Sequence, residues 1–207
     1  MHNIIIVDDH PVVVMALRIL LEKNGFNVTA TSDNGVDALK KIKTETPDAI
    51  IIDIGIPQLD GLEVIRRLRK QNSSIRILVL TAQPALIFST KCFREGASGF
   101  ISKKDKLDEI VRGLHAVLAG YTYFPEESRQ PDEAIPVPSE VEFLRSLSSR
   151  EIIVLQQLSS GLSNRQIADR MLLSEKTIST YKKSIMKAAR ANSLIDIIDI
   201  ARRNGII

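Results

Sequence analysis

The sequence predicts an α/β protein in which a flavodoxin-like, doubly wound, five-stranded parallel sheet is followed by a small all-α bundle of four helices. Strand-like and helix-like segments alternate five times in residues 1–124, which is the pattern of a doubly wound sheet. A proline-rich acidic stretch then interrupts the pattern, and only helical patterns follow it. We therefore expect a first domain over residues 1–124, a linker over residues 125–143 and a second domain over residues 144–207.

The expected strands are short apolar runs rich in β-branched residues, typical of strands buried on both faces. They are Ile4–Val7, Asn27–Thr31, Ala49–Ile52, Ile77–Leu80 and Gly99–Ile101. The expected helices between and after them are Val12–Asn24, Gly35–Thr46, Leu62–Gln71, Leu86–Glu95 and Leu107–Ala119. Right-handed crossovers and the strand order 2-1-3-4-5 would place the first strand beside the third.

The later segments are predicted from turn and capping signals. Four prolines and unpaired acids over Pro125–Pro138, without an apolar period, indicate a linker. Ser148 and Ser163 each precede a Glu or Gln by three residues, the capping-box pattern of a helix start. Two further helix starts are indicated by Ser174 and Ser193.

Composition narrows the class of protein. The single cysteine, Cys92, excludes an intrachain disulfide and suits a reducing compartment. The chain has no apolar run of about 18 residues, and its first residues lack a signal peptide, so we expect a cytoplasmic protein without a membrane span. Residues 144–207 carry 11 Lys or Arg against 5 Asp or Glu. This excess suits phosphate-backbone binding, although ordinary solvated surfaces carry similar charge.

Three carboxylates follow the ends of two expected strands that should be neighbours. Asp8 and Asp9 follow the first strand, and Asp53 follows the third. Ligands bind at the carboxyl edge of open parallel sheets, and converging carboxylates with hard oxygen donors suit Mg²⁺. An N-cap role before His10 would explain Asp8 or Asp9 alone, but not Asp53. The pattern predicts a magnesium site suited to phosphoryl chemistry.

Two more polar residues are expected at the same edge. Thr81 follows the fourth strand, and Lys103 follows the fifth. A hydroxyl and an ammonium group could hold the other oxygens of a phosphoryl group beside the metal. Each residue alone would be an ordinary strand-end or solvated residue, but together with the three acids they close one edge of one sheet.

Residues 1–124 resemble the receiver domain of two-component response regulators. The resemblance implies that Asp53 is the phosphoacceptor and that Phe100 is an aromatic switch residue. It also implies that Mg²⁺ is held by Asp8, Asp9, Asp53 and the backbone carbonyl of Gly55, and that Thr81 and Lys103 contact the phosphoryl group. One departure is Lys104, where many receivers have proline after the lysine.

The segments Gly161–Ala168 and Ser174–Tyr181 resemble a LuxR-type helix-turn-helix, with a recognition helix that starts near Glu175 and enters the major groove. On that helix Ile178, Tyr181 and Ile185 should pack inward. The residues expected to contact DNA phosphates or base edges are Lys176, Thr177, Ser179, Thr180, Lys182 and Lys183.

The last helix, over Leu194–Arg203, resembles the one through which these modules dimerise on DNA. Its apolar residues recur at helical spacing, and the same face could form the core instead, or serve both purposes. The candidate dimerisation residues are Leu194, Ile197, Ile198 and Ala201.

The whole layout is most similar to NarL/FixJ-class regulators, in particular the BvgA/EvgA-like group. It implies a homodimeric, double-stranded-DNA-binding transcription regulator, phosphorylated by a sensor histidine kinase or its phosphotransfer domain, with no turnover of an external substrate. The alternative is a magnesium-dependent aspartyl phosphotransferase or phosphatase with a helical cap, but that class needs a second acid where Gly55 stands. A third interpretation treats the C-terminal bundle as a protein-interaction module.

Overall fold

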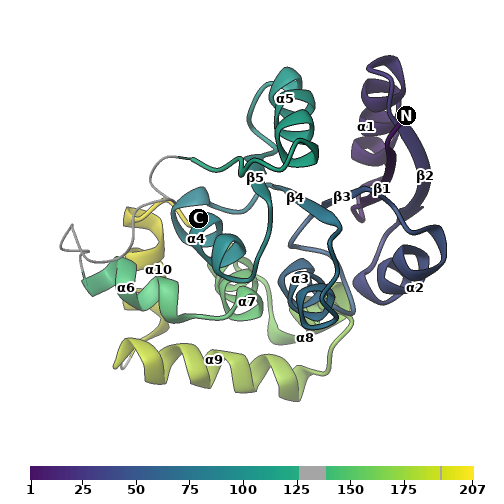
Figure 1. Ribbon diagram of the computed structural model, residues 1–207. Helices are drawn as coiled ribbons and strands as arrows, with labels where there is room; N and C mark the ends of the chain where they lie inside the picture. The colour runs from purple at the N-terminus through teal and green to yellow at the C-terminus, as the bar shows by residue number, and fades with distance from the viewer. Residues whose placement is uncertain (126–138, 192) are drawn as a thin grey trace. The chain divides into compact units, whose positions relative to one another are not determined.

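The computed structural model describes residues 1–125, 139–191 and 193–207. The chain forms two compact units, Met1–Arg129 and Gln130–Ile207. Figure 1 shows the first unit as a sheet covered by helices and the second as helices alone. Each unit is described by itself below.

The first unit contains a five-stranded parallel sheet in the order β2-β1-β3-β4-β5, as the sequence predicts. The strands are β1 (Asn3–Val7), β2 (Asn27–Ser32), β3 (Ala49–Ile52), β4 (Arg76–Thr81) and β5 (Gly99–Ser102). In the register of the three central strands, Ile5 of β1 pairs with Ile50 of β3, which pairs with Ile77 of β4. These strands are almost wholly apolar because both faces of the sheet are covered by helices.

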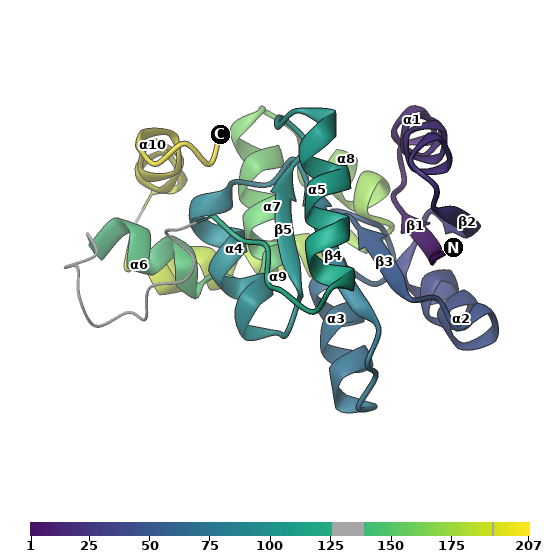
Figure 2. The ribbon, with the colours of Figure 1, turned by 45° about the horizontal axis from the view of Figure 1, so that its top comes forward.

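Helices cover both faces of the sheet (Figure 1). The first face carries α1 (Pro11–Lys23) and α5 (Leu107–Leu118), and the second carries α2 (Gly35–Glu45), α3 (Gly61–Lys70) and α4 (Ala85–Arg94). In the turned view of Figure 2, α5 runs alongside β4 and β5, which it contacts. Every strand and helix expected in residues 1–124 is present, with bounds that differ by one residue at most ends.

The core of the first unit follows the two-residue period of the strands. Ile4 and Ile6 pack with Leu17 and Leu21 of α1, in a cluster that also contains Leu114 of α5. Ile5 points to the opposite face and is fully buried there. The alternation anchors helices on both faces and holds the carboxyl ends of the strands at one edge.

The second unit has five helices among the described residues: α6 (Ser139–Ser146), α7 (Ser149–Ser159), α8 (Asn164–Met171), α9 (Glu175–Ala189) and α10 (Leu194–Arg203). Ser148 and Ser163 both form complete capping boxes, as predicted. Ser174 accepts a hydrogen bond from the backbone N–H of Thr177 at the start of α9, and Ser193 caps α10. Of the three residues of α9 expected to pack inward, Ile178 and Ile185 are fully buried, whereas Tyr181 is only half-buried.

The structure differs from the sequence-based expectation in the segment assigned to the linker. Residues 126–138 of the predicted linker lie outside the described residues. Residues 139–143 belong instead to α6, which adds a fifth helix to the four expected. Val141 and Leu144 are 7% and 0% exposed, so this helix is held by burial of two apolar residues at helical spacing. No helix in the described part of the chain is long and apolar enough to cross a membrane.

Candidate functional site

Two carboxylates lie side by side at the carboxyl edge of the sheet. The backbone N–H of Asp8 donates to the carbonyl of Ser32 at 2.9 Å, and that of Asp53 donates to the carbonyl of Val7 at 2.9 Å. These bonds extend the ladders one residue beyond β1 and β3, so both side chains emerge at the same edge. Asp8 is 3% exposed and Asp53 is 6% exposed. Buried carboxylates this close need a cation to offset their repulsion.

Lys103 supplies one such cation. Its Nζ lies 2.6 Å from Oδ2 of Asp8 and 2.6 Å from Oδ2 of Asp53. Its backbone N–H donates to the carbonyl of Thr81 at 2.8 Å, which fixes the residue just after β5. Burial alone would lower the pKa of Lys103, but the charges and hydrogen bonds of Asp53 and Asp8 outweigh it and raise that pKa. The ammonium group therefore stays charged and bridges the two carboxylates.

Asp9 and His10 complete a cluster of possible metal ligands. Nδ1 of His10 lies 3.0 Å from Oδ1 of Asp8 and 2.9 Å from Oδ1 of Asp9. Ligand atoms of Asp8, Asp9, His10 and Asp53 all lie within 4.8 Å of one another. Partial burial raises the pKa of Asp9; His10 opposes this rise, whereas the negative charges of Asp53 and Asp8 add to it.

Sequence reasoning missed His10 as a neighbour of the acids. The alternative role of Asp8 or Asp9 as a helix cap does not apply, because the N-cap of α1 is His10 and no side chain caps that helix. The position of His10 between Asp9 and Pro11 was the available signal, since proline favours the first helical position, which makes the preceding residue the N-cap, directly beside the acids in the chain.

The donor set of the cluster fits a hard divalent cation. Three carboxylates offer oxygen atoms, the ligands that Mg²⁺ prefers, whereas the His10 nitrogen is less suited to it. Oδ1 of Asp53 also accepts a hydrogen bond from the backbone N–H of Gly55 at 3.2 Å, so the Gly55 backbone lies against the carboxylate. The acidic cluster could therefore hold a metal ion.

Gly61, the first residue of α3, packs directly against the backbone of Asp53. A Cβ on Gly61 would lie 2.3 Å from the carbonyl oxygen of Asp53, closer than real Cβ atoms approach. The backbone N–H of Gly61 donates to the carbonyl of Ile54 at 3.1 Å, which closes the turn that follows β3. Gly61 thus allows α3 to start directly beside the carboxylate-bearing strand end.

Thr81 is the last residue of β4, and Phe100 is the second residue of β5, where it pairs with Val79 of β4. Thr81 is completely buried, and its hydroxyl accepts a hydrogen bond from the backbone N–H of Gln83 at 3.3 Å. Among the described residues, the Thr81 hydroxyl is not hydrogen-bonded to either carboxylate. Phe100 is 2% exposed, so its ring lies inside the unit. Thr81 therefore lies at the same edge of the sheet as the acids, whereas Phe100 lies inside the unit, on the neighbouring strand β5.

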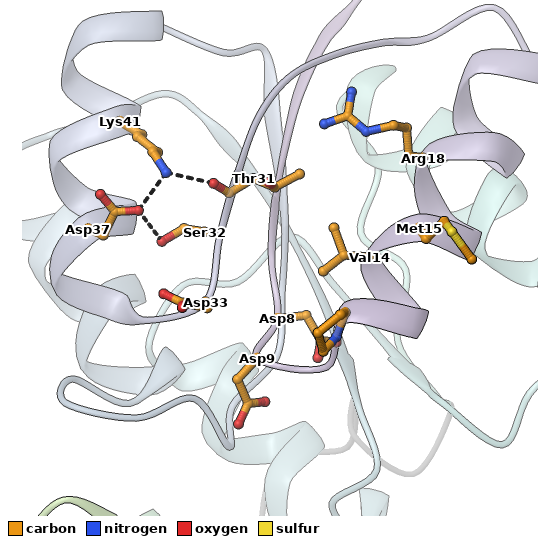
Figure 3. Close-up of a pocket in the computed structure, with 11 residues that line it drawn as sticks. Asp8, Asp9, Val14, Met15, Arg18, Thr31, Ser32, Asp33, Asp37 and Lys41 are labelled. Atoms are coloured by element: carbon orange, nitrogen blue, oxygen red, sulfur yellow. Dashed lines mark hydrogen bonds and ion pairs between the residues drawn. The ribbon is translucent and has the colours of Figure 1, made fainter.

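A hollow of about 540 Å³ between α1 and α2 borders the acidic cluster. Figure 3 shows Val14, Met15 and Arg18 of α1 on one side, with Asp8 and Asp9 at one end. On the other side Lys41 donates to the carbonyl of Thr31 at 2.8 Å and pairs with Asp37 at 2.7 Å (Figure 3). The acids are therefore reached from a concave surface beside α1.

In the second unit, α9 presents a basic stripe to solvent. Lys176, Thr180, Lys183 and Lys187 are exposed and recur at helical spacing, so they share one face of the helix. We call these four residues the α9 stripe. Lys187 is exposed, as expected of a lysine that either faces phosphates or is simply solvated, and it extends the stripe by one turn.

The remaining predicted DNA-contact residues are only partly exposed. Oγ1 of Thr177 lies 2.8 Å from Oγ of Ser174, within the N-terminal cap of α9. Nδ2 of Asn164 on α8 donates to Oγ of Ser179 at 3.2 Å. Lys182 is half-buried. These residues lie at or beside the exposed face, and two of them already contact neighbours within the unit.

The candidate dimerisation residues of α10 divide into two pairs. Ile197 and Ala201 are completely buried, so they belong to the core, which was the alternative role considered for this face. Leu194 and Ile198 are half-buried, and the neighbouring Ile195 is 68% exposed. Ile197 and Ala201 are therefore not accessible for direct contact with a second copy, whereas Leu194, Ile195 and Ile198 are at least partly exposed.

Comparison with known families decides what these two units are. Residues 4–115 match the response regulator receiver domain, and residues 145–201 match the luxR family of bacterial regulatory proteins. The chain belongs to the response regulators. Each match covers the unit in which the corresponding site lies: the carboxylate edge in the receiver unit, and the α9 stripe in what we now call the helix-turn-helix unit.

Known response regulators are similar over the whole chain. The virulence-factor transcription regulator BvgA of Bordetella pertussis is 46% identical over 209 residues, covering 99% of both proteins. The DNA-binding transcriptional activator EvgA of Escherichia coli is 37% identical over 204 residues, again covering 99% of both. A solved structure of RcsB from Salmonella typhimurium has a TM-score of 0.68 and 25% identity, and the match covers 96% of this chain and 95% of that one.

These similarities establish the class of the protein. It is a DNA-binding transcriptional response regulator of the NarL/FixJ class, with a receiver and a LuxR-type helix-turn-helix, and it is not an enzyme that turns over an external substrate. The phosphatase alternative is excluded by this membership.

Proposed function

We propose that Asp53 is the phosphoacceptor of this response regulator. The observation that carries the proposal is the pairing of buried Asp53 with Lys103 at 2.6 Å, beside the second carboxylate Asp8. A carboxylate oxygen of Asp53 attacks the phosphorus of a phosphohistidine donor. The new O–P bond forms as the N–P bond breaks, and the leaving imidazole nitrogen takes a proton.

Asp8, Asp9, Asp53 and the backbone carbonyl of Gly55 are the proposed ligands of Mg²⁺. Three of these residues are supported by the mutual approach of their ligand atoms within 4.8 Å. When bound, the ion would neutralise negative charge on the transferring phosphoryl group. The role of Asp8 and Asp9 would be to hold the ion against Asp53.

We propose that three residues respond to phosphorylation of Asp53, namely Lys103, Thr81 and Phe100. Phosphorylation replaces one carboxylate oxygen contact of Lys103 with a more highly charged phosphoryl group. Lys103 then pairs with a phosphoryl oxygen, and the Thr81 hydroxyl rotates to donate to another. Thr81 and Phe100 are both buried, so movement of the Thr81 hydroxyl would change the packing of the Phe100 ring and thereby the surface near β4 and β5.

The helix-turn-helix unit is the proposed output. We propose that the α9 stripe contacts phosphates and base edges of double-stranded promoter DNA, and that Ser179, Thr177 and Lys182 lie at the margin of this interface. Phosphorylation would favour a homodimer that binds two half-sites, with α10 contributing through Leu194 and Ile198. The proposed phosphodonor is a sensor histidine kinase or its phosphotransfer domain, and the proposed site of action is the cytoplasm, where the DNA is.

The decisive experiment compares Asp53→Asn with Asp33→Asn. Asp33 is an exposed carboxylate after β2 that borders the α1–α2 hollow, so its variant is a matched control for charge and place. Incubation with acetyl phosphate and Mg²⁺ should add one phosphoryl group to the wild type and to Asp33→Asn, as measured by intact mass. Asp53→Asn should gain none, and chelation of Mg²⁺ should stop labelling of the wild type. Undiminished labelling of Asp53→Asn would reject the assignment.

A further inference from the structure

The receiver unit has another hollow, at the opposite edge of the sheet from the carboxylates. It measures about 270 Å³ and lies where β4 and β5 begin, between the loop after α3, the loop after α4 and the end of α5. Two guanidinium groups, those of Arg69 and Arg76, line it, together with hydroxyl side chains that include Ser73 and Ser74. We call it the basic hollow. The lining contains no Asp or Glu among the described residues.

Arg69 is fixed in place without being neutralised. Its Nε donates to the carbonyl of Gly96 at 2.8 Å, and its Nη1 donates to the carbonyls of Ser73 and Ile75 at 2.8 and 3.0 Å. All three acceptors are neutral, so they orient the guanidinium but leave its charge uncompensated. Burial lowers the pKa of Arg69, and the nearby charge of Arg76 lowers it further.

Arg76 brings a second positive charge to the same space. It is the first residue of β4 and is exposed, and no described carboxylate pairs with it. Other arginines of the receiver unit do have acidic partners: Arg66 pairs with Glu95 at 2.7 Å, and Arg67 pairs with Glu63 at 2.9 Å. Two like charges held together with no anion between them repel, and an anionic ligand would remove that repulsion.

Two glycines shape the walls of the basic hollow. Gly96 has φ +90°, and a Cβ there would lie 3.0 Å from Cγ of Arg69. Gly120 has φ +93°, and a Cβ there would lie 3.7 Å from Nη2 of Arg76. Both positions are in the left-handed region that favours glycine. The backbone therefore passes beside both guanidinium groups without side chains that would cover them.

We propose that the basic hollow binds a small oxyanion, namely a phosphate group that is either free or carried by a small metabolite. The guanidinium of Arg76 can offer paired N–H donors to an oxyanion, Nη2 of Arg69 takes no part in the three bonds to carbonyls and can donate as well, and the serine hydroxyls can donate to the remaining oxygens. The volume lies just below the roughly 300–1,000 Å³ of pockets for drug-sized ligands, so it suits an ion or a small molecule. The site is separate from Asp53, which lies at the other end of the strands.

The test is a titration of the full-length protein with inorganic phosphate in metal-free buffer, followed by ¹⁵N NMR. Saturable shifts are expected for the backbone amides of Ser73, Ser74, Gly96 and Gly120. Sodium chloride at matched ionic strength should not reproduce them. Asp53→Asn should bind phosphate as the wild type does, which separates this site from the phosphorylation site. Binding should also raise the melting temperature, because a ligand of the native state stabilises it.

Arg76→Gln is the informative variant, because Arg76 is exposed and its loss should not prevent folding. It should weaken phosphate binding about tenfold, the effect of losing one charge-assisted contact. Arg112→Gln is the matched control: Arg112 is also an exposed arginine of the receiver unit, but it pairs with Glu109 on α5 and does not line the basic hollow. Arg112→Gln should change the affinity for phosphate less than twofold.

Glycerol phosphate distinguishes the two sources of the ligand. Equal affinity for glycerol phosphate and inorganic phosphate would indicate that the phosphate group alone is recognised. Tighter binding of glycerol phosphate would indicate a phosphorylated metabolite. The proposal is overturned if chloride produces the same shifts, if the shifts do not saturate, or if Arg76→Gln binds phosphate as tightly as the wild type.

Discussion

In the receiver site, Asp8 and Asp53 are buried and both contact Lys103, whereas the lysines of the α9 stripe are exposed and lie along a single helix. Lys103 and Asp53 are 50 residues apart in the sequence, yet Nζ and Oδ2 are 2.6 Å apart in the fold. Lys176 and Lys183 are seven residues apart on one helix, which separates them by about 10.5 Å along its axis. The first pair depends on the whole sheet for its geometry, and the second depends only on the helix that carries it.

The two regions should therefore respond differently to mutation. Removal of one member of a buried charge pair leaves its partner unpaired in a low-dielectric environment, which costs several kilocalories per mole. Removal of an exposed lysine costs little stability and acts on the nucleic acid contact alone. The receiver site should therefore couple function to stability, and the α9 stripe should separate the two.

The largest effect is expected for Lys103→Ala. Without the ammonium group, the buried carboxylates of Asp8 and Asp53 face each other, and the free energy of unfolding of the receiver unit should fall by about 3 kcal/mol in the absence of metal. Hydrogen exchange of the β3 and β4 amides measures this for the receiver unit alone. Lys104→Ala, at the exposed neighbouring position, should change it by less than about 0.5 kcal/mol. A similar loss in both variants would contradict the comparison.

A smaller effect is expected for Lys183→Ala. If Lys183 contacts a phosphate, the slope of log affinity against log salt should become less negative by about 0.9, while the free energy of unfolding stays within about 0.5 kcal/mol of the wild type. Fluorescence anisotropy with labelled promoter DNA at several salt concentrations measures the slope. Lys40→Ala, an exposed lysine of the receiver unit, should leave the slope unchanged.

The double variant Lys176→Ala/Lys183→Ala tests whether the two lysines contribute independently to DNA binding. The two side chains are far enough apart that their effects on binding should add within about 0.5 kcal/mol. If the changes in binding free energy of the two single variants do not add, the lysines of the α9 stripe are coupled to each other, as the charges of the receiver site are. That result would contradict the proposed difference between the two regions.

The smallest effect is expected for Glu63→Gln, which probes an ion-pair network on the surface of the receiver unit. The hydrogen bond from Arg67, with further attraction from Arg66 and Lys70, lowers the pKa of Glu63. A carboxylate whose folded pKa is depressed stabilises the fold above its ordinary pKa of about 4.3, and this contribution disappears as the pH falls through the folded pKa.

Glu63→Gln should therefore lower the stability of the receiver unit at pH 7 by less than about 1 kcal/mol. The gap between variant and wild type should narrow as the pH falls from about 5 to 3. Urea unfolding at successive pH values measures the difference in free energy of unfolding between variant and wild type. A difference that widens on acidification would show that the ion pair of Glu63 with Arg67 does not stabilise the fold.

Some features could be predicted from the sequence because they rest on local rules. The strands end where their β-branched runs end, so Asp8 and Asp53 could be placed at one edge once the strand order was assumed. The two capping boxes have three-residue spacings that the helix geometry dictates. The exposed lysines of α9 follow the 3.6-residue period that buries Ile178 and Ile185.

Other features could not be predicted, because distant elements decide them. That Lys103 bridges both carboxylates depends on the position of β5, which is separated from β1 by β3 and β4 in the sheet. His10 joins the acids because α1 begins beside the strand end, and α6 forms because Val141 and Leu144 are buried. Asn164 contacts Ser179 only because α8 packs on α9.

Periodicity and capping act over a few residues, so the order of strands and helices, the helix caps, the acids at strand ends and the basic face of α9 could all be predicted from the amino-acid sequence. The tertiary structure decided which charges touch, that Ile197 and Ala201 are buried on α10, and that Arg69 and Arg76 share a hollow. Three acids at strand ends were visible in the chain, but the ammonium group that bridges two of them is brought there only by packing of the whole sheet.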